Sequence, residues 1–191
     1  MRERESVQIT EDFQKELDAS EFIDRFRDFD KFNSFCRACP QYERSWACPP
    51  FSIDIESQLS QFSRVLLHAT KIIPPDKGLS ISAARELLKP VRMRLEKKFI
   101  EIESSCNGLF LGFAGSCPYC PEDSCTRPMG LPCRFPRHCR PSLESYGFDL
   151  CSAVSENFGF EILWSNDGSL PSYLTLVCGL FHNGMNQVHR P

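Results

Sequence analysis

Eleven of the 191 residues are cysteines, and four of these lie within one short segment. They follow the pattern Cys117-x2-Cys120-x4-Cys125-x7-Cys133, in a stretch that prolines punctuate. Proline fixes the backbone φ angle and removes an N–H donor, so it stiffens a loop that has no ladder of hydrogen bonds. A [4Fe–4S] cluster is bound by four cysteine thiolates. The spacing therefore predicts one such cluster in residues 115–141, which we call the second cysteine loop.

A first cysteine loop, residues 36–51, offers three ligands in the pattern Cys36-x2-Cys39-x8-Cys48, followed by two prolines. These three thiols predict a second metal, whose fourth ligand is not local. A position left open to solvent or substrate would make that metal a Lewis acid. Otherwise the candidates for the fourth ligand are four other cysteines: Cys106, Cys139, Cys151 and Cys178.

Zinc is the alternative metal for both loops. The pairs Cys36/Cys39 and Cys117/Cys120 have the spacing of the two knuckles of a zinc ribbon, and zinc accepts four thiolates in tetrahedral geometry. A ribbon would leave Cys48, and with it Cys125 and Cys133, unused at plausible ligand spacing. The pattern therefore favours iron and sulfide over zinc.

Three functions remain open at this point. A cluster would transfer electrons to a redox protein partner or support the redox chemistry of an enzyme. Structural zinc would instead stabilise an interaction module that has no chemistry of its own. The third alternative is an enzyme whose open-site metal binds a small anion between the two loops. None of the common sequence signatures of nucleotide-binding loops, serine hydrolases or zinc proteases is present.

Basic residues follow the last cysteine of the second loop. We predict that three arginines help to bind the cofactor: Arg134, Arg137 and Arg140. A cluster with four thiolates is anionic, and nearby Arg donors stabilise it. They would also suit a phosphate or carboxylate, and a solvated basic loop is equally consistent with the sequence. Cys139 is predicted to be a reserve ligand or an exposed redox thiol. Cys151 and Cys178 are predicted to be core thiols.

Composition limits the class of protein. Because the formal net charge is −3, we do not expect the protein to bind nucleic acid or anionic membranes. No apolar run approaches the ~18 residues of a membrane-spanning helix, and the first residues lack the apolar stretch of a signal peptide. We therefore expect a cytoplasmic protein in a reducing compartment, where thiols bind metals or pack in cores. We expect a single domain over residues 1–191, with residues 1–35 as a helical arm packed on it.

The first half of the chain has patterns of helix, strand and helix. Residues 10–35 are predicted to be helical, with Thr10 and Ser20 as caps. Residues 64–70 are predicted to form a strand. A long helical stretch is expected over residues 81–105, which Pro90 must kink or divide.

The second half is predicted to contain three strands and a helix. The strands are expected at residues 109–113, 160–164 and 173–180, the last two as an antiparallel pair joined by a turn. Asp149 can cap a helix that ends near Gly159. This order predicts an α+β fold: a single compact domain with a small sheet flanked by helices and two Cys-rich metal-binding loops.

Three segments together resemble a known family, the predicted metal-binding proteins catalogued as domain of unknown function 2284. They are Cys36-Arg-Ala-Cys39 with the following Tyr42, Trp46 and Cys48-Pro49-Pro50; Gly115-Ser-Cys117-Pro-Tyr-Cys120 with Cys125 and Pro132-Cys133-Arg134-Phe135-Pro136; and Arg140-Pro141-Ser142-Leu143-Glu144 with Gly147 and Asp149. The resemblance implies a prokaryotic cytosolic protein with cysteine-bound metal. The sequence departs from the family in two places. The gap from Cys120 to Cys125 is longer than in the usual Cys-x2-Cys-x2-Cys pattern, which weakens the prediction that Cys125 is a ligand. In addition, Cys139 stands where no cysteine is expected in the family.

Overall fold

The fold is built on a four-stranded antiparallel sheet with the strand order β1-β2-β4-β3. The computed structural model describes residues 9–76, 78–121 and 123–184. The strands are β1 (Ile9–Asp18), β2 (Arg64–Ile73), β3 (Leu109–Leu111) and β4 (Leu174–His182). β2 pairs along its length with β1 on one side and β4 on the other. Together with the helices this gives the α+β single domain that the sequence predicts.

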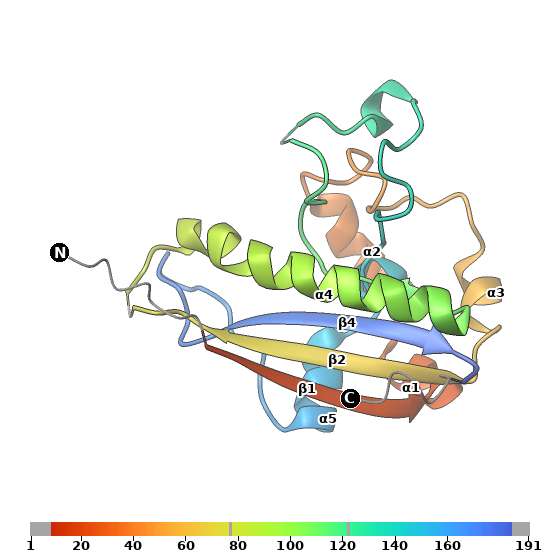
Figure 1. Cartoon of the computed structure of the whole chain (residues 1–191), viewed down its shortest axis with the longest axis horizontal. Helices are drawn as coiled ribbons and strands as arrows, with labels where there is room; N and C mark the ends of the chain where they lie inside the picture. The colour runs from red at the N-terminus through yellow and green to blue at the C-terminus, as the bar shows by residue number, and fades with distance from the viewer. Residues whose placement is uncertain (1–8, 77, 122, 185–191) are drawn as a thin grey trace.

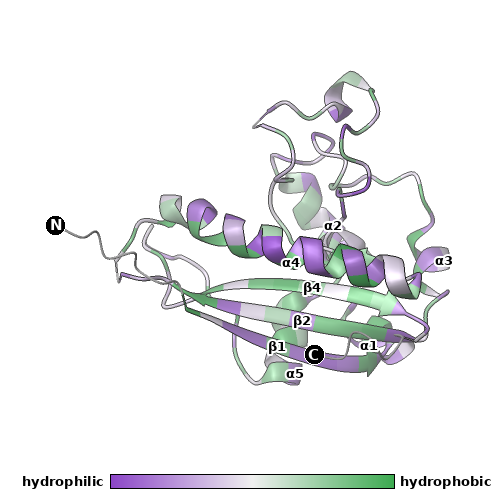
Figure 2. Cartoon of the chain, viewed as in Figure 1, coloured by the Kyte–Doolittle hydropathy of each residue, from purple (hydrophilic) through white to green (hydrophobic). Residues whose placement is uncertain are grey.

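Helices cover both faces of this sheet (Figure 1). The long helix α4 (Ala84–Cys106) packs on one face, where its buried Leu95 and Phe99 join residues of β4 in one core. The helices α1 (Ala19–Phe26) and α5 (Leu150–Phe158) pack on the other face. Successive side chains of a strand point to opposite faces, so the two central strands supply both cores. Figure 2 shows this as predominantly hydrophobic β2 and β4 beside a more hydrophilic edge strand β1.

The remaining helical elements are short. They are α2 (Phe29–Ala38), α3 (Ile55–Leu59) and the 3₁₀ turns η1 (Ile81–Ala83), η2 (Arg127–Met129) and η3 (Glu144–Tyr146). The first cysteine loop begins in the last turn of α2, and the second follows β3 and contains η2. Both loops protrude from the same side of the molecule (Figure 1). Within the described residues, no helix is long and apolar enough to cross a membrane.

The predicted helix over residues 10–18 is wrong, because this segment is the edge strand β1. Phe13 and Leu17 are four residues apart, a spacing typical of a helix, but pairing along the whole of β2 decides the structure. The Phe13 ring lies against Phe158 and Phe160 in the core. Asp18, and not Ser20, caps α1 by accepting the N–H groups of the next turn.

The predicted strand at residues 160–164 is also wrong. β4 forms as expected, but its partners are β2 and β3, so no hairpin joins it to residues 160–164. That segment has no regular secondary structure but packs against the core through Phe160 and Ile162, and the Tyr173 hydroxyl donates to its Glu161 carbonyl at 2.6 Å. α4 continues through Pro90 as one helix and is not divided there. β2, β3 and α5 form where the sequence predicts them, and Asp149 and Gly159 are the caps of α5.

Gly147 fastens the turn η3 to the junction between α1 and α2. Its φ angle is +92°, and a Cβ at this position would lie 2.6 Å from the Phe29 Cα. The Asp28 N–H donates to the Gly147 carbonyl at 2.9 Å, and the Asp149 N–H donates to the Phe26 carbonyl at 2.7 Å. This close approach fixes the start of α2, and with it the position of the first cysteine loop.

We therefore expect Gly147→Ala to lower the free energy of unfolding by about 2–4 kcal/mol, because it adds a backbone clash to the strain of a positive φ angle. Gly159→Ala is the matched control, since Gly159 also has a positive φ angle, +72°, but nothing lies within 4 Å of its Cβ position. That variant should lose only about 1–2 kcal/mol. Urea unfolding of the two variants checks this, and equal losses would contradict the close packing of η3 on α2.

Candidate metal centre

The two cysteine loops are joined to each other by side-chain contacts. The Trp46 indole N–H lies 3.2 Å from both the Thr126 hydroxyl and the Leu131 carbonyl. In the opposite direction, the Arg127 guanidinium donates to the Ser45 and Pro50 carbonyls, at 2.6 Å each, and to the Cys48 carbonyl. The loops therefore form one unit, although 63 residues of sequence, 52–114, separate them.

A cavity of about 100 Å³ lies between the loops. Its lining includes all four predicted ligands of the second loop and one further cysteine, and these thiols belong to Cys117, Cys120, Cys125, Cys133 and Cys139. Aromatic rings of Trp46, Tyr119 and Phe135 also line it. The positively charged residues in its wall are Arg44 and Arg85. The thiols of the second loop thus line one cavity, and their role as metal ligands stays a prediction.

Three of these thiols are in direct contact. The Cys139 thiol donates a hydrogen bond to Cys117, and this bond, against the opposing effect of burial, lowers the pKa of Cys117 to about 6. Cys139 also contacts Cys133, and both neighbours raise the pKa of Cys139. The thiolate is the form that binds metals, so Cys117 is prepared to act as a ligand. The contact also adds Cys139, which the sequence leaves as a reserve ligand, to the thiols of the cavity.

The cysteines are arranged around a volume and do not meet at a point. Among the described residues, no three His, Cys, Asp or Glu side chains lie close enough together to hold a single ion as they stand. A [4Fe–4S] cube takes one sulfur at each of four iron corners, so its ligands surround the cofactor. The number and type of donors in the cavity fit that group.

α4 holds the start of the second loop through Arg92. This buried guanidinium donates to the carbonyls of Phe113 (3.2 Å), Ala114 (3.0 Å) and Ser116 (3.2 Å), and its Nε lies 2.7 Å from a Glu96 carboxylate oxygen. The last of these carbonyls belongs to the residue before Cys117. The sequence does not reveal this clamp of Arg92 on the loop, because a charged pair four residues apart on a helix usually marks an exposed face.

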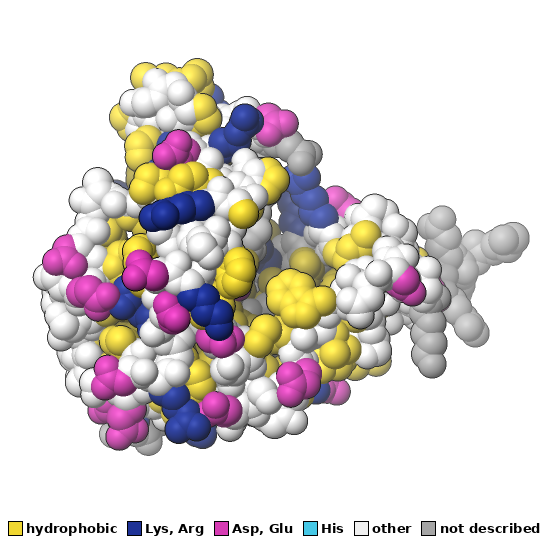
Figure 3. All heavy atoms as spheres, turned by 180° about the vertical axis from the view of Figure 1, so that it is seen from behind, with side chains coloured by type: hydrophobic (Ala, Val, Ile, Leu, Met, Phe, Trp, Pro, Cys, Tyr) yellow, Lys and Arg dark blue, Asp and Glu magenta, His cyan; other side chains and the backbone are white. Residues whose placement is uncertain are grey.

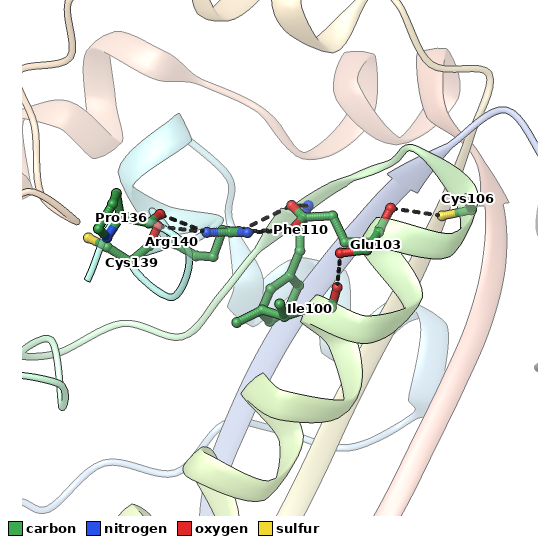
Figure 4. A network of polar contacts seen from close by, with 8 residues as sticks. Ile100, Glu103, Cys106, Phe110, Pro136, Cys139 and Arg140 are labelled. Carbon is green, nitrogen blue, oxygen red and sulfur yellow. Dashed lines mark hydrogen bonds and ion pairs between the residues drawn. The ribbon is translucent and has the colours of Figure 1, made fainter.

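Farther along α4, Glu103 holds the end of the loop through Arg140 (Figure 4). The Arg140 Nη2 lies 2.5 Å from a Glu103 oxygen, and its Nη1 donates to the Cys139 carbonyl at 3.0 Å. Glu103 also accepts the Phe110 N–H at 2.8 Å, which ties β3 to the same carboxylate. One rigid helix therefore positions both ends of the loop.

The three predicted cofactor-binding arginines lie outside the cavity lining. Arg140 is paired with Glu103, Arg134 donates to the Ser124 carbonyl at 2.9 Å, and Arg137 is exposed. Their role toward a cofactor stays a prediction.

A larger cavity of about 790 Å³ adjoins the first, between the N-terminal half of α4 and the start of the second loop. Figure 3 shows the hollow beside the protruding loops, with Lys and Arg side chains at its edge. Its lining includes Arg85, Lys89 and Cys120. One cysteine of the candidate site therefore borders both cavities.

The three cysteines of the first loop form a separate group. Burial raises the pKa of Cys48 to about 11, and the nearby Cys39 and Cys36 add to this rise. Burial also raises the pKa of Cys36, with smaller effects from Cys39 and Glu144. None of the three lines the cavity between the loops. Any metal that they bind is thus distinct from one held by the second loop.

The other cysteines lie away from both groups. Cys178 is fully buried in the core between the sheet and α4, as predicted. Cys151 is exposed on α5, so its prediction as a core thiol is wrong. Cys106 ends α4, where its thiol lies 3.8 Å from the Glu103 carbonyl (Figure 4).

Comparison with known proteins gives one match. A family model described as a predicted metal-binding protein (DUF2284) matches residues 25–180. That range contains all eleven cysteines. No curated protein and no solved structure matches the chain.

Proposed function

Because the chain belongs to the DUF2284 family of predicted metal-binding proteins, we propose that it is an iron–sulfur protein with a [4Fe–4S] cluster in the cavity between its two cysteine loops. The observation that carries the proposal is the convergence of five cysteines on that one cavity. A bound cluster supplies a site that accepts and releases an electron. The protein would use it for electron transfer to a partner or for the redox support of an enzyme.

Four of the five thiols suffice for a cluster, and we place Cys139 in the ligand set in preference to Cys125. Cys139 contacts both Cys117 and Cys133, and Arg140 holds its backbone carbonyl. Cys120 completes this set. Both Cys125, which follows a longer gap, and Cys139 depart from the pattern of the family, so the contacts of Cys139 decide between them.

Other residues of the cavity would tune the cluster. The rings of Trp46, Tyr119 and Phe135 limit the access of water, and exclusion of water changes the reduction potential of a cluster. Arg44 and Arg85 bring positive charge to the wall, which offsets the negative charge of four thiolates. The protein's part is therefore to hold, shield and balance the charge of the cofactor.

The tip of the second loop is the surface that we propose for a redox partner. Met129 and Leu131 are 59% and 52% exposed there. Arg134 and Arg137, on the same loop, are also exposed. An acidic protein surface with an apolar centre would fit this combination, and its binding would weaken as salt is added.

Reversible reduction tests the proposed function. Protein purified without oxygen should be brown, lose its visible absorption when dithionite is added, and regain it when an oxidant is added. The Cys178→Ser variant should behave in the same way, because that thiol lies in the core. A colourless protein, or colour that dithionite does not change, would overturn the proposal.

The ligand assignment gives a sharper prediction. Cys139→Ser should lose most of the iron, whereas Cys125→Ser should keep most of it, because Cys139 contacts both Cys117 and Cys133. Iron analysis of the two variants, purified side by side without oxygen, checks the assignment. The reverse order of iron contents would return Cys125 to the ligand set and remove Cys139.

A further inference from the structure

The larger of the two cavities beside the second cysteine loop is not filled by the proposed cluster. It has a volume of about 790 Å³ and forms the hollow beside the protruding loops in Figure 3. Its walls come from three parts of the fold: the N-terminal half of α4, the start of the second loop and, through Leu176, the strand β4. Cavities of this size hold small organic molecules in many proteins. The cavity therefore has the volume and the surroundings of a ligand site.

One face of α4 gives this cavity positive charge. Arg85, Lys89 and Arg92 follow one another at intervals of four and three residues, so they share one side of the helix, and all three line the cavity. Among the described residues of the lining, Glu86 is the one acidic side chain. Arg92 is held by Glu96 and by loop carbonyls, whereas Arg85 and Lys89 are exposed. An anion in the cavity would meet the charges of these two exposed side chains.

Apolar side chains form much of the remaining wall. Ile81 precedes α4, Leu88 lies on the helix, and Leu176 lies at the sheet. Ile81 is 42% exposed, and apolar surface of this kind is stabilised when a ligand removes it from water. The cavity thus combines an apolar wall with exposed cations. This combination suits an organic molecule that carries an anionic group.

The larger cavity shares part of its wall with the cavity between the loops. Arg85, Ser116, Cys120 and Pro121 belong to the lining of both. Cys120 is also one of the proposed ligands of the cluster. A molecule in the larger cavity would therefore lie beside a ligand of the cluster.

We propose that the larger cavity binds a small organic molecule with an apolar body and an oxyanion group, a carboxylate or a phosphate, and holds it beside the cluster. Arg85 and Lys89 bind the oxyanion, and the apolar wall covers the body of the molecule. The inference rests on the proposed function for the cluster and adds the class of molecule with which the cluster works. It needs no open position on the metal, because side chains of α4 bind the anion.

Titration calorimetry with three naphthalene compounds tests the recognition, on protein purified without oxygen. Naphthoate and naphthyl phosphate carry an oxyanion, and naphthamide, substituted at the same ring position, is the neutral compound. We expect at least one anion to bind roughly tenfold or more tightly than the amide, and salt should reduce the difference. The anion that binds more tightly identifies the preferred group. Binding of the amide as tight as that of both anions, or no binding of either anion, would overturn the inference.

Substitutions test whether the anion binds in this cavity. Lys89→Met removes the charge and keeps most of the side-chain length, so it should weaken binding of the preferred anion roughly fivefold and leave the amide unchanged. Arg94→Met is the matched control, because Arg94 is exposed on the same helix and is not among the lining residues. Ile81→Ser should weaken the anion and the amide alike, since it removes apolar surface. Equal effects of Lys89→Met and Arg94→Met would mean that the anion binds elsewhere.

The reduction potential of the iron-loaded protein tests the position beside the cluster. A negative charge near the cluster disfavours the added electron, so saturation with the preferred anion should lower the potential, and the amide should change it less. An unchanged potential would contradict the position beside Cys120. The effects of the substitutions on binding do not depend on iron, whereas iron and acid-labile sulfide report the cluster. Failure of the anion site and failure of the proposed function are therefore distinguishable.

Discussion

Serine in place of Cys117 is expected to remove nearly all iron and acid-labile sulfide from the protein. A hydrogen bond from Cys139 lowers the pKa of Cys117 to about 6, which favours its binding as a thiolate. Its position is fixed by the Arg92 clamp on the preceding residues. A serine hydroxyl does not ionise near neutral pH and is a poor ligand for iron in a cluster. Iron and sulfide analysis of protein purified without oxygen measures the loss.

Cys178→Ser is the control for this experiment. The same substitution there places a hydroxyl in the core between the sheet and α4. It should reduce stability by about 1–3 kcal/mol and leave iron and sulfide unchanged. If both variants lost iron equally, the distinction between ligands and core thiols would be wrong.

The second large effect is expected for Arg92→Ala. The substitution removes three hydrogen bonds to the start of the second loop and leaves Glu96 buried without its partner. Breaking a buried ion pair by removal of one partner costs about 3–5 kcal/mol. We expect a loss of this size in the free energy of unfolding, together with the loss of most of the iron. Urea unfolding and iron analysis of the same preparation measure both.

Two further variants distinguish the effect of Arg92 on the stability of the fold from its effect on the position of the second cysteine loop. Arg94→Ala, on the exposed side of the same helix, should change stability by no more than about 0.5 kcal/mol and keep its iron. Arg92→Met combined with Glu96→Leu replaces the ion pair by apolar residues and should restore most of the stability. Iron should stay low in that double variant, because the loop carbonyls still lack their donor. Full recovery of iron would show that the clamp only stabilises the fold.

The parts of the fold that sequence reasoning predicted are those whose pattern is local and strong. The buried residues of α4, such as Leu95 and Phe99, recur at helical spacing, and helix caps such as Asp149 and Gly159 mark the ends of α5. The edge strand β1 was missed because only part of it is buried. Its conformation comes from pairing with β2, which no short window of sequence contains.

In the candidate site, too, the sequence predicted the local features and not the contacts between distant segments. Cysteine spacing alone grouped four of the five thiols that line the cavity, because one short loop holds them. The contact of Cys139 with Cys117 depends on the turn of the chain between them, and spacing did not reveal it. The clamps that Arg92 and Glu103 form from α4 join segments distant in sequence. Such contacts have no local signature, so only the folded structure shows them.

Metal and sulfide analysis of the wild-type protein, purified without oxygen, tests the central proposal most directly. The proposed cluster requires about four iron atoms and four acid-labile sulfides per chain. Protein that contains zinc in both loops and no sulfide would contradict the proposed cluster and favour a zinc-stabilised interaction module.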